Sequence, residues 1–392
     1  MKVAVLGGFG LMAEAALHDL AAHPRVSEVL AADVTLSRAK SVLAKIPNKR
    51  KIKAVKIDLT DAAKAARALR GSAVVLNCAW YEYNLKAMDL SLALGAHYVD
   101  LGGLYHATLK QLARGAEFKR RGLLACLGCG STPGITNMMV ARMAPSFETI
   151  DTVGIYDASH DPSLSNDSFL PPFSIRTMLA EYVQPAPILR AGRMKDVPAH
   201  SEPETLDFKL PIGRVTAGAV IHSETATLPA YLKDKGVKNI SFKIVYPDIV
   251  KRQLAMLVGM GFDKNQPIDV NGGSVSPMRF VTALAQQSAA HISGIPADFE
   301  ILRVRVDGSR NGRPLLKIWD CEIRPTRALS AGTMGVGFAG SIAAVMLAEK
   351  KTLLDSGAAA PESVLNADVF FKELKARKVF SLVETIAHPL LL

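Results

Sequence analysis

The first residues whose types and spacing could support chemistry are the glycines near the start of the chain. The run Gly8-Phe9-Gly10-Leu11-Met12-Ala13 fits the pattern G-x-G-x-x-G/A, which binds the diphosphate of a dinucleotide. The first glycine permits a tight turn, and the second lets the backbone approach the diphosphate. Free N–H groups at the start of the next helix would hold the negative charge. The predicted contacts are Gly7, Gly8, Phe9, Gly10, Leu11 and Met12.

Asp33 is the acidic residue that this motif requires. It lies 23 residues beyond Gly10, at the end of the apolar run 29–32. A carboxylate there accepts hydrogen bonds from the ribose hydroxyls and would repel a 2'-phosphate. The sequence therefore favours NAD as the cofactor, while the nearby cations Arg38 and Lys40 keep NADP open. The alternative is a structural strand, turn and helix that bind no ligand.

Predicted strands alternate with helical patterns over the first third of the chain. The strands are expected at 3–6, 29–33, 54–58, 73–77, 97–101 and 123–127. Thr60 is expected to cap the helix after the third strand. Six strands alternating with helices predict the α/β fold class, with a doubly wound parallel sheet of the Rossmann type.

A ligand of such a sheet lies outside the carboxyl ends of its strands. Asp58 ends the third strand and could contact the adenine, although a turn or helix cap explains it equally well. The fourth and fifth strands end nearer the expected nicotinamide, and Asp100 closes the fifth. The remaining predicted cofactor contacts are Asn77, Cys78, Ala79, Leu101 and Gly102.

The pattern changes after the sixth strand, which runs into the glycine-rich segment 128–134. We therefore expect a Rossmann domain over 1–134 and a second α/β domain with a mixed sheet over 135–329. Strands of the second domain are expected at 149–156, 215–220, 237–245, 299–306 and 315–323, with a turn at 307–312 between the last two. The polar loop 159–172 is expected to be a binding element or lid. The segment 330–392 is expected to pack back on the first domain.

Composition narrows the possible partners. The net charge is +11, but Lys and Arg are scattered, and the dense run 48–53 is expected to be a solvated loop, so no nucleic-acid partner is predicted. The apolar stretch 328–348 contains several glycines and hydroxyls, so a buried helix is expected there, with a helical core near 335–349, and no membrane partner. No signal peptide precedes the first strand, which predicts a cytoplasmic protein.

The cysteines give no strong indication of a metal. Cys126 and Cys129 form one C-x-x-C pair, but no second pair or nearby histidine completes a zinc site. Reduced thiols are expected, and metal or redox chemistry is the weaker alternative.

Several longer motifs together resemble the saccharopine dehydrogenase-related family, and within it most closely the L-lysine 6-dehydrogenases. The motifs lie at 5–12, 32–34, 77–84, 98–103, 132–137, 173–175 and 360–362. The resemblance implies a Rossmann domain and an α/β substrate domain that carries the contacts of a homodimer, with the active site between them. It also implies NAD- or NADP-dependent oxidation of a C–N bond in a small amino acid or amine, such as L-lysine.

Oxidation of an amine carbon needs a base for the ammonium proton and a group that moves protons while water attacks. The candidates for these acid–base roles are Asp100, Asp157 and His222, and an imidazole suits proton transfer near neutral pH. Each could instead be structural. The candidate substrate contacts are Tyr81, Tyr83, Arg176, Glu224 and Thr225. Arg176 could bind a substrate carboxylate through two hydrogen bonds, or be solvated.

The chain departs from the family pattern in ways that bear on the substrate. Arg176 stands where lysine dehydrogenases look to have an acid, and 222–225 replaces a glycine-containing segment. Thr132 precedes Pro-Gly where saccharopine reductases look to carry an acid, which argues against that activity. Two alternatives stay open: a reductase that joins an amine to a carbonyl, as saccharopine and carboxynorspermidine enzymes do, and a non-catalytic dinucleotide sensor.

Overall fold

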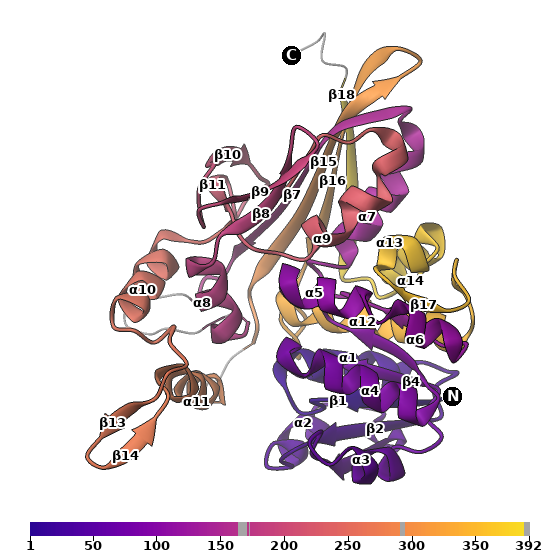
Figure 1. Ribbon diagram of the computed structural model, residues 1–392, viewed down its shortest axis with the longest axis vertical. Coiled ribbons are helices and arrows are strands. Elements are labelled where there is room, and N and C mark those ends of the chain that lie inside the picture. The colour runs from indigo at the N-terminus through magenta and orange to yellow at the C-terminus, as the bar shows by residue number, and fades with distance from the viewer. Residues whose placement is uncertain (164–170, 172, 291–294, 388–392) are drawn as a thin grey trace.

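The computed structural model describes residues 1–163, 171, 173–290 and 295–387, which form two large β-sheets (Figure 1). The first sheet is parallel, with strand order β17-β6-β5-β4-β1-β2-β3. Its strands are β1 (Lys2–Leu6), β2 (Glu28–Asp33), β3 (Ile52–Lys56), β4 (Val74–Asn77), β5 (His97–Asp100), β6 (Leu124–Cys126) and β17 (Gly357–Ala359). Strands β1 to β6 lie where six strands were predicted, so the Rossmann sheet is confirmed.

Helices cover both faces of this sheet, which explains why its strands read as continuous apolar runs. One face carries α1 (Leu11–Ala22), α2 (Ala39–Ala44) and α12 (Ala331–Ala348), and the other carries α3 (Ala62–Ala68), α4 (Asn84–Leu94) and α6 (Gly115–Arg120). The helix α5 (Tyr105–Leu112) follows β5. Cys126 and Cys129, where β6 ends, are buried as free thiols with their Sγ atoms 3.2 Å apart.

The apolar segment near 335–349 forms α12, which packs against α1. In the described part of the chain it is the one helix long and apolar enough to cross a membrane, and 78% of that window is buried in the protein. The predicted buried helix is therefore confirmed. Its core position also ties the C-terminal third of the chain to the Rossmann domain.

The second sheet is mixed, as predicted: β12 and β7 are parallel and the other pairs are antiparallel. Its main path is β10-β11-β12-β7-β15-β16-β18, and β8 and β9 extend it beside β12. The strands are β7 (Thr149–His160), β8 (Ala186–Arg190), β9 (Arg193–Val197), β10 (Glu204–Asp207), β11 (Arg214–Ala219), β12 (Asn239–Val245), β15 (Phe299–Arg310), β16 (Arg313–Ile323) and β18 (Phe380–Ala387).

Helices surround this sheet in two groups. Near the junction with the first domain lie α7 (Ile135–Met143), α9 (Glu224–Tyr231), α13 (Pro361–Val364) and α14 (Ala367–Ala376). To one side lie α8 (Ile175–Val183), α10 (Asp248–Gly259) and α11 (Pro277–Ala290), with the ribbon of β13 (Ile268–Val270) and β14 (Gly273–Val275) (Figure 1). The predicted binding loop lies largely outside the described residues, at 164–170 and 172.

Three differences from the predictions change how the second sheet and the C-terminal segment are built. Strand β7 continues past 156 to His160, so Asp157 is a strand residue. The turn between β15 and β16 shrinks to Asn311 and Gly312, because their φ angles of 51° and 67° form the left-handed two-residue turn that suits a hairpin. The C-terminal segment is divided, since β17 joins the first sheet while β18 pairs with β16 in the second.

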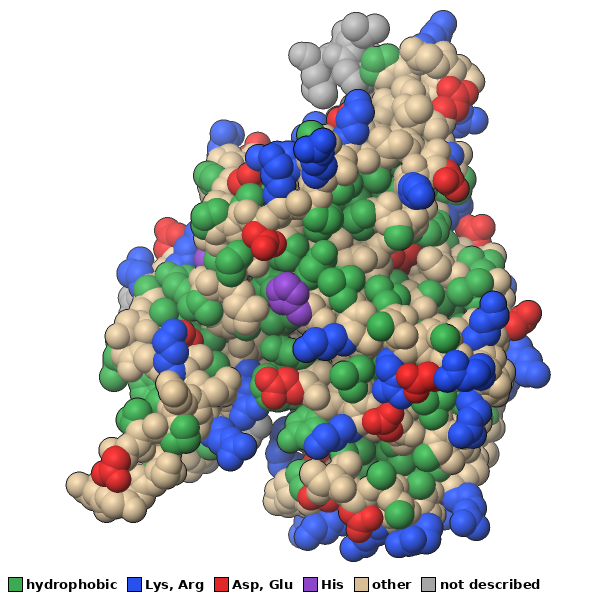
Figure 2. Space-filling model, viewed as in Figure 1, with side chains coloured by type: hydrophobic (Ala, Val, Ile, Leu, Met, Phe, Trp, Pro, Cys, Tyr) green, Lys and Arg blue, Asp and Glu red, His purple; other side chains and the backbone are tan. Residues whose placement is uncertain are grey.

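Charged side chains are intermixed over the face seen in Figure 2, where Lys and Arg lie on both domains with acidic residues among them. The basic run 48–53 is only partly a loop, because 49–51 forms a short 3-10 turn and 52–53 begins β3. Ile52 is buried there, which anchors the exposed cations around it.

Candidate active site

The glycine turn after β1 leaves no room for side chains. A Cβ on Gly7, whose φ is +62°, would stand 2.8 Å from the amide nitrogen of Ala79, and one on Gly8 would stand 2.9 Å from the backbone of Ala31. Gly10 then begins α1 without a side-chain cap, so the N–H groups of its first turn are open to an anion. This cradle fits the diphosphate of a dinucleotide.

Asp33 lies beside the same turn. Its Oδ2 accepts a hydrogen bond from the Phe9 amide at 3.1 Å, and its Oδ1 accepts one from the Thr35 amide at 3.4 Å. Each carboxylate oxygen has a second lone pair, which leaves capacity for ribose hydroxyls. The predicted motif and its acid are therefore brought together as a dinucleotide site requires.

Asn77 and Asp100 are joined by a buried chain of side-chain hydrogen bonds rather than directed into open space. The Asn77 amide donates to Asn84 at 2.8 Å, the Asn84 amide donates to Gln111 at 3.1 Å, and Gln111 donates to Asp100 Oδ2 at 2.5 Å. The other Asp100 oxygen accepts from the amides of two glycines, at 2.7 and 3.0 Å. This network fixes the carboxyl ends of β4, β5 and β6.

These contacts suit a residue that positions the strand ends, and the acid–base role of Asp100 stays a prediction. Burial raises the pKa of Asp100, and its hydrogen-bond donors offset only part of this effect. The two donating glycines are Gly102 and Gly128. Both have φ angles in the left-handed region, at 113° and 78°, and both lie against Pro133. Sequence reasoning placed Asp100 at the correct strand end but could not see that its oxygens are already occupied.

Four other predicted cofactor contacts have defined places. Cys78 and Ala79 leave β4 against the glycine turn. Leu101 lies under α12, where Gly340 makes room for its side chain. Asp58 is exposed and accepts two hydrogen bonds from Thr60, at 2.8 and 2.7 Å, so the structure shows the turn role. The cap of α3 is Asp61, which accepts from the Lys64 amide at 3.0 Å, and not Thr60 as predicted.

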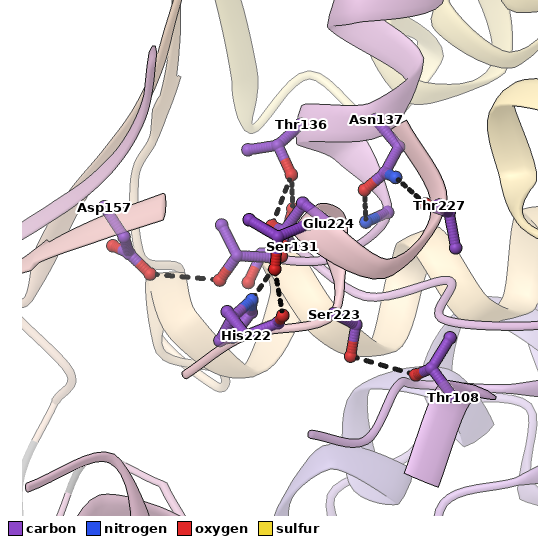
Figure 3. Close-up of polar contacts among 12 residues, drawn as sticks. Thr108, Ser131, Thr136, Asn137, Asp157, His222, Ser223, Glu224 and Thr227 are labelled. Carbon is purple, nitrogen blue, oxygen red and sulfur yellow. Dashed lines mark hydrogen bonds and ion pairs between the residues drawn. The ribbon is translucent and has the colours of Figure 1, made fainter. Parts of the chain in front are cut away.

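A second cluster of polar residues lies in the other domain, where its loops meet the Rossmann domain (Figure 3). His222 follows β11, stacks on Phe242 of β12 with 3.9 Å between ring centroids, and pairs through Nδ1 with Glu224. Glu224 begins α9, is fully buried, and accepts from Thr136 at 3.1 Å. Burial lowers the pKa of His222, but the charges of Glu224, Glu181 and Asp157 more than offset it, so that pKa lies above its usual value.

Asp157 of β7 faces this histidine. Its Oδ2 accepts from the Thr132 hydroxyl at 3.3 Å. Burial raises the pKa of Asp157 to about 6, a rise that His222 and Thr132 limit and Glu224 reinforces. A carboxyl with this pKa changes protonation near neutral pH, as a general acid or base must.

Glu181 of α8 belongs to the cluster and was missed by sequence reasoning. It is 2% exposed, and its Oε2 accepts from the Tyr246 hydroxyl at 2.6 Å. Burial raises the pKa of Glu181 to about 7. The available signal was weak: helical spacing puts Glu181 three residues after the buried Met178, so an acid falls on the apolar face of the helix.

The other predicted substrate contacts lie in different places, and only some of them are near the cluster. Tyr81 packs against Ala180 and Ile221, which brings the loop after β4 next to α8 and the His222 segment, and burial raises its pKa to about 12. Tyr83 is 42% exposed beside Lys86 and lies outside the cluster. The Thr225 hydroxyl donates to the His222 carbonyl at 3.0 Å and so supports the turn itself.

Arg176 lies in the first turn of α8 and reaches across to the Rossmann domain. Its guanidinium carbon lies 4.2 Å from the ring centroid of Trp80, and its Nε donates to Thr282 of α11 at 3.0 Å. The terminal nitrogens of Arg176 have no hydrogen-bond partner among the described residues. Planar guanidinium nitrogens of this kind suit a carboxylate.

Hydroxyl groups hold the cluster against the Rossmann domain. The Ser223 hydroxyl donates to the Gly103 carbonyl, and Thr108 of α5 donates to Ser223 at 3.1 Å. Asn137 of α7 contacts Glu362 of α13 at 3.0 Å and accepts from the Gly134 amide, which fixes the turn before Thr136. The acid–base residues therefore lie at the edge of the Rossmann sheet where β4 and β5 end.

A cavity of about 530 Å³ lies elsewhere, on the opposite face of the second sheet. It is lined by Tyr156, and side chains alternate along a strand, so Asp157 points away from it. Its charged groups are already paired: Glu204 accepts from Lys243 at 2.8 Å and from Tyr156 at 2.9 Å. This cavity is separate from the acid–base cluster.

A Rossmann domain joined to a mixed-sheet domain, with buried titratable side chains where they meet (Figure 3), is the arrangement of a two-domain pyridine-nucleotide oxidoreductase. Residues 3–126 match the family description "Saccharopine dehydrogenase NADP binding domain", and residues 130–379 match "Saccharopine dehydrogenase C-terminal domain". The chain belongs to the saccharopine dehydrogenase family, and it is an NAD(P)-dependent oxidoreductase that acts on C–N bonds.

Two curated relatives are distant in sequence. The chain is 24% identical over 306 residues to carboxyaminopropylagmatine dehydrogenase of Synechocystis sp., covering 74% of this chain and 73% of the relative. It is 24% identical over 200 residues to carboxynorspermidine synthase of Vibrio cholerae, covering 50% of this chain and 46% of the relative. The family predicted from the motifs is confirmed, whereas the closer likeness to L-lysine 6-dehydrogenases stays a prediction.

Among solved structures, the fold is similar to that of apo saccharopine dehydrogenase (L-Glu forming) from Saccharomyces cerevisiae. The TM-score is 0.74 at 15% identity, and the match covers 98% of this chain and 99% of the other. This likeness confirms the fold class of a parallel Rossmann-like sheet with a mixed α/β domain.

Proposed function

We propose that this protein uses a reduced nicotinamide coenzyme to join an amine and a carbonyl compound into a secondary amine, and that it can run the reverse oxidation. The observation that carries the proposal is the cluster of His222, Asp157, Glu181 and Glu224 at the ends of β4 and β5. The names of the two relatives, both of which describe carboxylated polyamines, support an amine and a carboxylate in the product.

The reaction requires proton transfers to and from the reacting groups and one hydride transfer. An ammonium must lose a proton before its nitrogen can attack the carbonyl carbon, the carbonyl oxygen must gain protons to leave as water, and the resulting C=N bond is then reduced. The coenzyme, bound by the glycine turn and Asp33, supplies the hydride for the last step. Side chains of the protein have to carry out the proton transfers.

The cluster offers groups for each proton transfer. Asp157, with a pKa of about 6, is largely ionised at pH 7 and can take the ammonium proton. His222 is paired with Glu224 through Nδ1, which leaves its Nε2 to exchange a proton with the departing oxygen. Glu181, with a pKa of about 7, can return a proton to the site. Arg176 binds the substrate carboxylate, and Tyr81 lines the space between the domains.

The test is spectrophotometric. Oxidation of NADH or NADPH is followed at 340 nm with diamines or amino acids paired with short aldehydes that carry a carboxylate, and the product is identified by mass spectrometry. We expect coenzyme oxidation only when both partners are present. No turnover with any pair, in either direction, would overturn the proposal.

A second candidate is oxidative deamination of an amino acid such as L-lysine to the semialdehyde or cyclic imine. Arg176 and the carboxyl groups favour it too, because lysine carries a carboxylate at one end and an ammonium at the other. Ammonia as the sole nitrogen donor in the reductive direction would select this reaction. Coenzyme binding without turnover would instead select the dinucleotide sensor.

We further propose a homodimer located in the cytoplasm, with small amines or amino acids as ligands and no nucleic-acid or membrane partner. The family resemblance supports the dimer. Light scattering after size exclusion measures its mass directly, and a monomer at micromolar concentration would contradict it.

A further inference from the structure

Glu300 of β15 is a buried carboxyl group that has no role in the mechanism above. It is 6% exposed, and its Oε2 is buried without a hydrogen-bond partner in the described part of the chain. Burying a carboxylate removes its hydration, which is unfavourable unless a partner replaces the lost water. Glu300 therefore lacks a partner that a buried acid normally has.

Strand pairing places Glu300 beside the candidate active site. Glu300 is opposite Ser159, and its neighbour Leu302 is opposite Asp157, so Glu300 and Asp157 lie on the same face of the sheet as diagonal neighbours. The Cα atoms of such diagonal neighbours are about 7–8 Å apart in an antiparallel pair of strands. Thr132, which donates to Asp157, follows Ser131 of the same loop.

Within the described part of the chain, the other elements packed around Glu300 bring no positive charge to it. Helix α12 approaches through Gly335, where an added Cβ would lie 3.2 Å from Ser131 and 3.3 Å from Glu300 Oε2. The titratable groups that act on Glu300 or that it acts on are Asp157 on β7, Asp298 before β15 and Cys321 on β16. All three are acids, so nothing described on any side compensates the charge of an ionised Glu300.

Protons, rather than cations from neighbouring described residues, compensate the buried acids of this region. Burial, then Asp157 and Asp298, raise the pKa of Glu300 well above its usual value, which favours the protonated form of its carboxyl group. Burial is also the main reason that the pKa values of Asp157 and Glu181 are raised. Among the described residues, the basic group that acts on Asp157 and Glu181 is His222, which is already paired with Glu224.

We propose that Glu300 binds the second cationic group of a diamine whose reacting ammonium is held by Asp157. The inference rests on the proposed function, in that the substrate is an amine, and it adds that the preferred amine has two positive charges. When the second ammonium arrives, the proton on Glu300 is released to solvent and a carboxylate–ammonium pair forms. A monoamine leaves Glu300 protonated.

Calorimetry of the full-length protein saturated with reduced coenzyme tests this without turnover, because no carbonyl partner is present. The probes are 1,3-diaminopropane and 1,4-diaminobutane against propylamine and butylamine, each titrated in phosphate and in Tris so that proton release can be measured. We expect at least one diamine to bind about tenfold more tightly than its monoamine and to release more protons. Glu300→Gln should remove most of that preference and the extra proton release, while monoamine affinity changes less than about twofold.

Glu322→Gln is the matched control, since Glu322 is a buried glutamate of the neighbouring strand β16 that is paired with Lys209 on the opposite face. It should leave the diamine preference intact. If Glu300→Gln does not fold, Glu300→Met, which keeps the length of the side chain without the acid, takes its place. Equal binding of diamines and monoamines, no binding of either, or an unchanged preference in the Glu300 variants would overturn the inference.

The outcomes separate this inference from the proposed function. Diamine preference through Glu300 without turnover of any amine and carbonyl pair would overturn the proposed reaction alone. Turnover with monoamines and diamines at equal efficiency would overturn the role of Glu300 alone.

Discussion

At the scale of single residues, the common property of the site is that burial sets its acidity. Glu181 and Asp157 have pKa values of about 7 and 6 because the fold removes them from water, and the surrounding acids raise the pKa of His222 against the effect of its burial. Perturbed acids gathered beside a cofactor edge are typical of active sites, although structural networks also perturb acids, as Asp100 shows.

The raised pKa of Glu181 predicts a pH-dependent stability. A carboxyl that is harder to ionise in the folded state than in the unfolded chain destabilises the fold as pH rises from its unfolded value near 4.5 through its folded value of about 7. Glu181→Gln removes this pH-dependent destabilisation. The unfolding free energy of the variant minus that of the natural protein should therefore rise by about 3 kcal/mol between pH 4 and pH 8. Urea unfolding of both proteins at pH 4 and pH 8 measures this difference. The prediction would be contradicted if the stabilities of the two proteins changed with pH in the same way.

Asp33 predicts the coenzyme preference. Asp33→Ala removes hydrogen bonds to the ribose and the repulsion of a 2'-phosphate, so the ratio of NADPH to NADH affinity should rise by at least about tenfold. Quenching of protein fluorescence by each coenzyme gives both dissociation constants. If affinity for NADH and NADPH were equally unaffected, the assignment of Asp33 to the ribose would be wrong.

At the scale of elements, the contact between α1 and α12 connects the coenzyme site to the C-terminal part of the chain. Gly337 of α12 lies so close to α1 that an added Cβ would stand 2.7 Å from Ala15 and from the Met12 carbonyl. Met12 belongs to the first turn of α1, the turn that is expected to hold the diphosphate. Packing of these two helices therefore bears on coenzyme binding as well as on stability.

Gly337→Ala should accordingly lower the unfolding free energy by about 1–3 kcal/mol and weaken coenzyme binding. Gly332→Ala is the control, because Gly332 lies on the same helix with nothing within 4 Å of an added Cβ, and there alanine should be neutral or slightly stabilising. Thermal unfolding with and without NADH compares the two variants. Equal behaviour of both would show that the helix contact tolerates a methyl group.

At the scale of the whole molecule, few polar contacts hold the acid–base cluster against the Rossmann domain. The Ser223 hydroxyl joins the Gly103 carbonyl to Thr108, and Arg176 lies over Trp80. These contacts come from both domains, so they set the distance between the hydride carbon of a bound coenzyme and the proton-transferring groups.

Ser223→Ala should therefore impair the reaction without affecting coenzyme affinity. Loss of one buried hydrogen-bonded hydroxyl is worth about 1 kcal/mol, so kcat/KM for the amine should fall about fivefold. The dissociation constant for NADH serves as the internal control. A parallel loss of coenzyme affinity would mean that the hydroxyl supports the Rossmann domain itself rather than its docking.

The sequence by itself determined the Rossmann domain, because its signals are local. The glycine turn, the acid at Asp33 and the apolar runs of β1 to β6 each depend on residues close together in the chain. The mixed second sheet was predicted from its strands, but β8, β9, β10 and β18 were missed, because none of these segments alternates strictly between apolar and polar residues.

Only the tertiary structure decided the site. Asp157, Glu181, His222 and Tyr246 come from four separate segments, and no spacing in the chain announces their meeting. The fold also distinguishes acidic residues that look alike in sequence. Both oxygens of Asp100 accept hydrogen bonds within the protein, whereas Asp157 and Glu300 keep oxygens that can accept from a ligand. Acidity and hydrogen-bond capacity depend on every group within a few ångströms, and the fold alone brings those groups together.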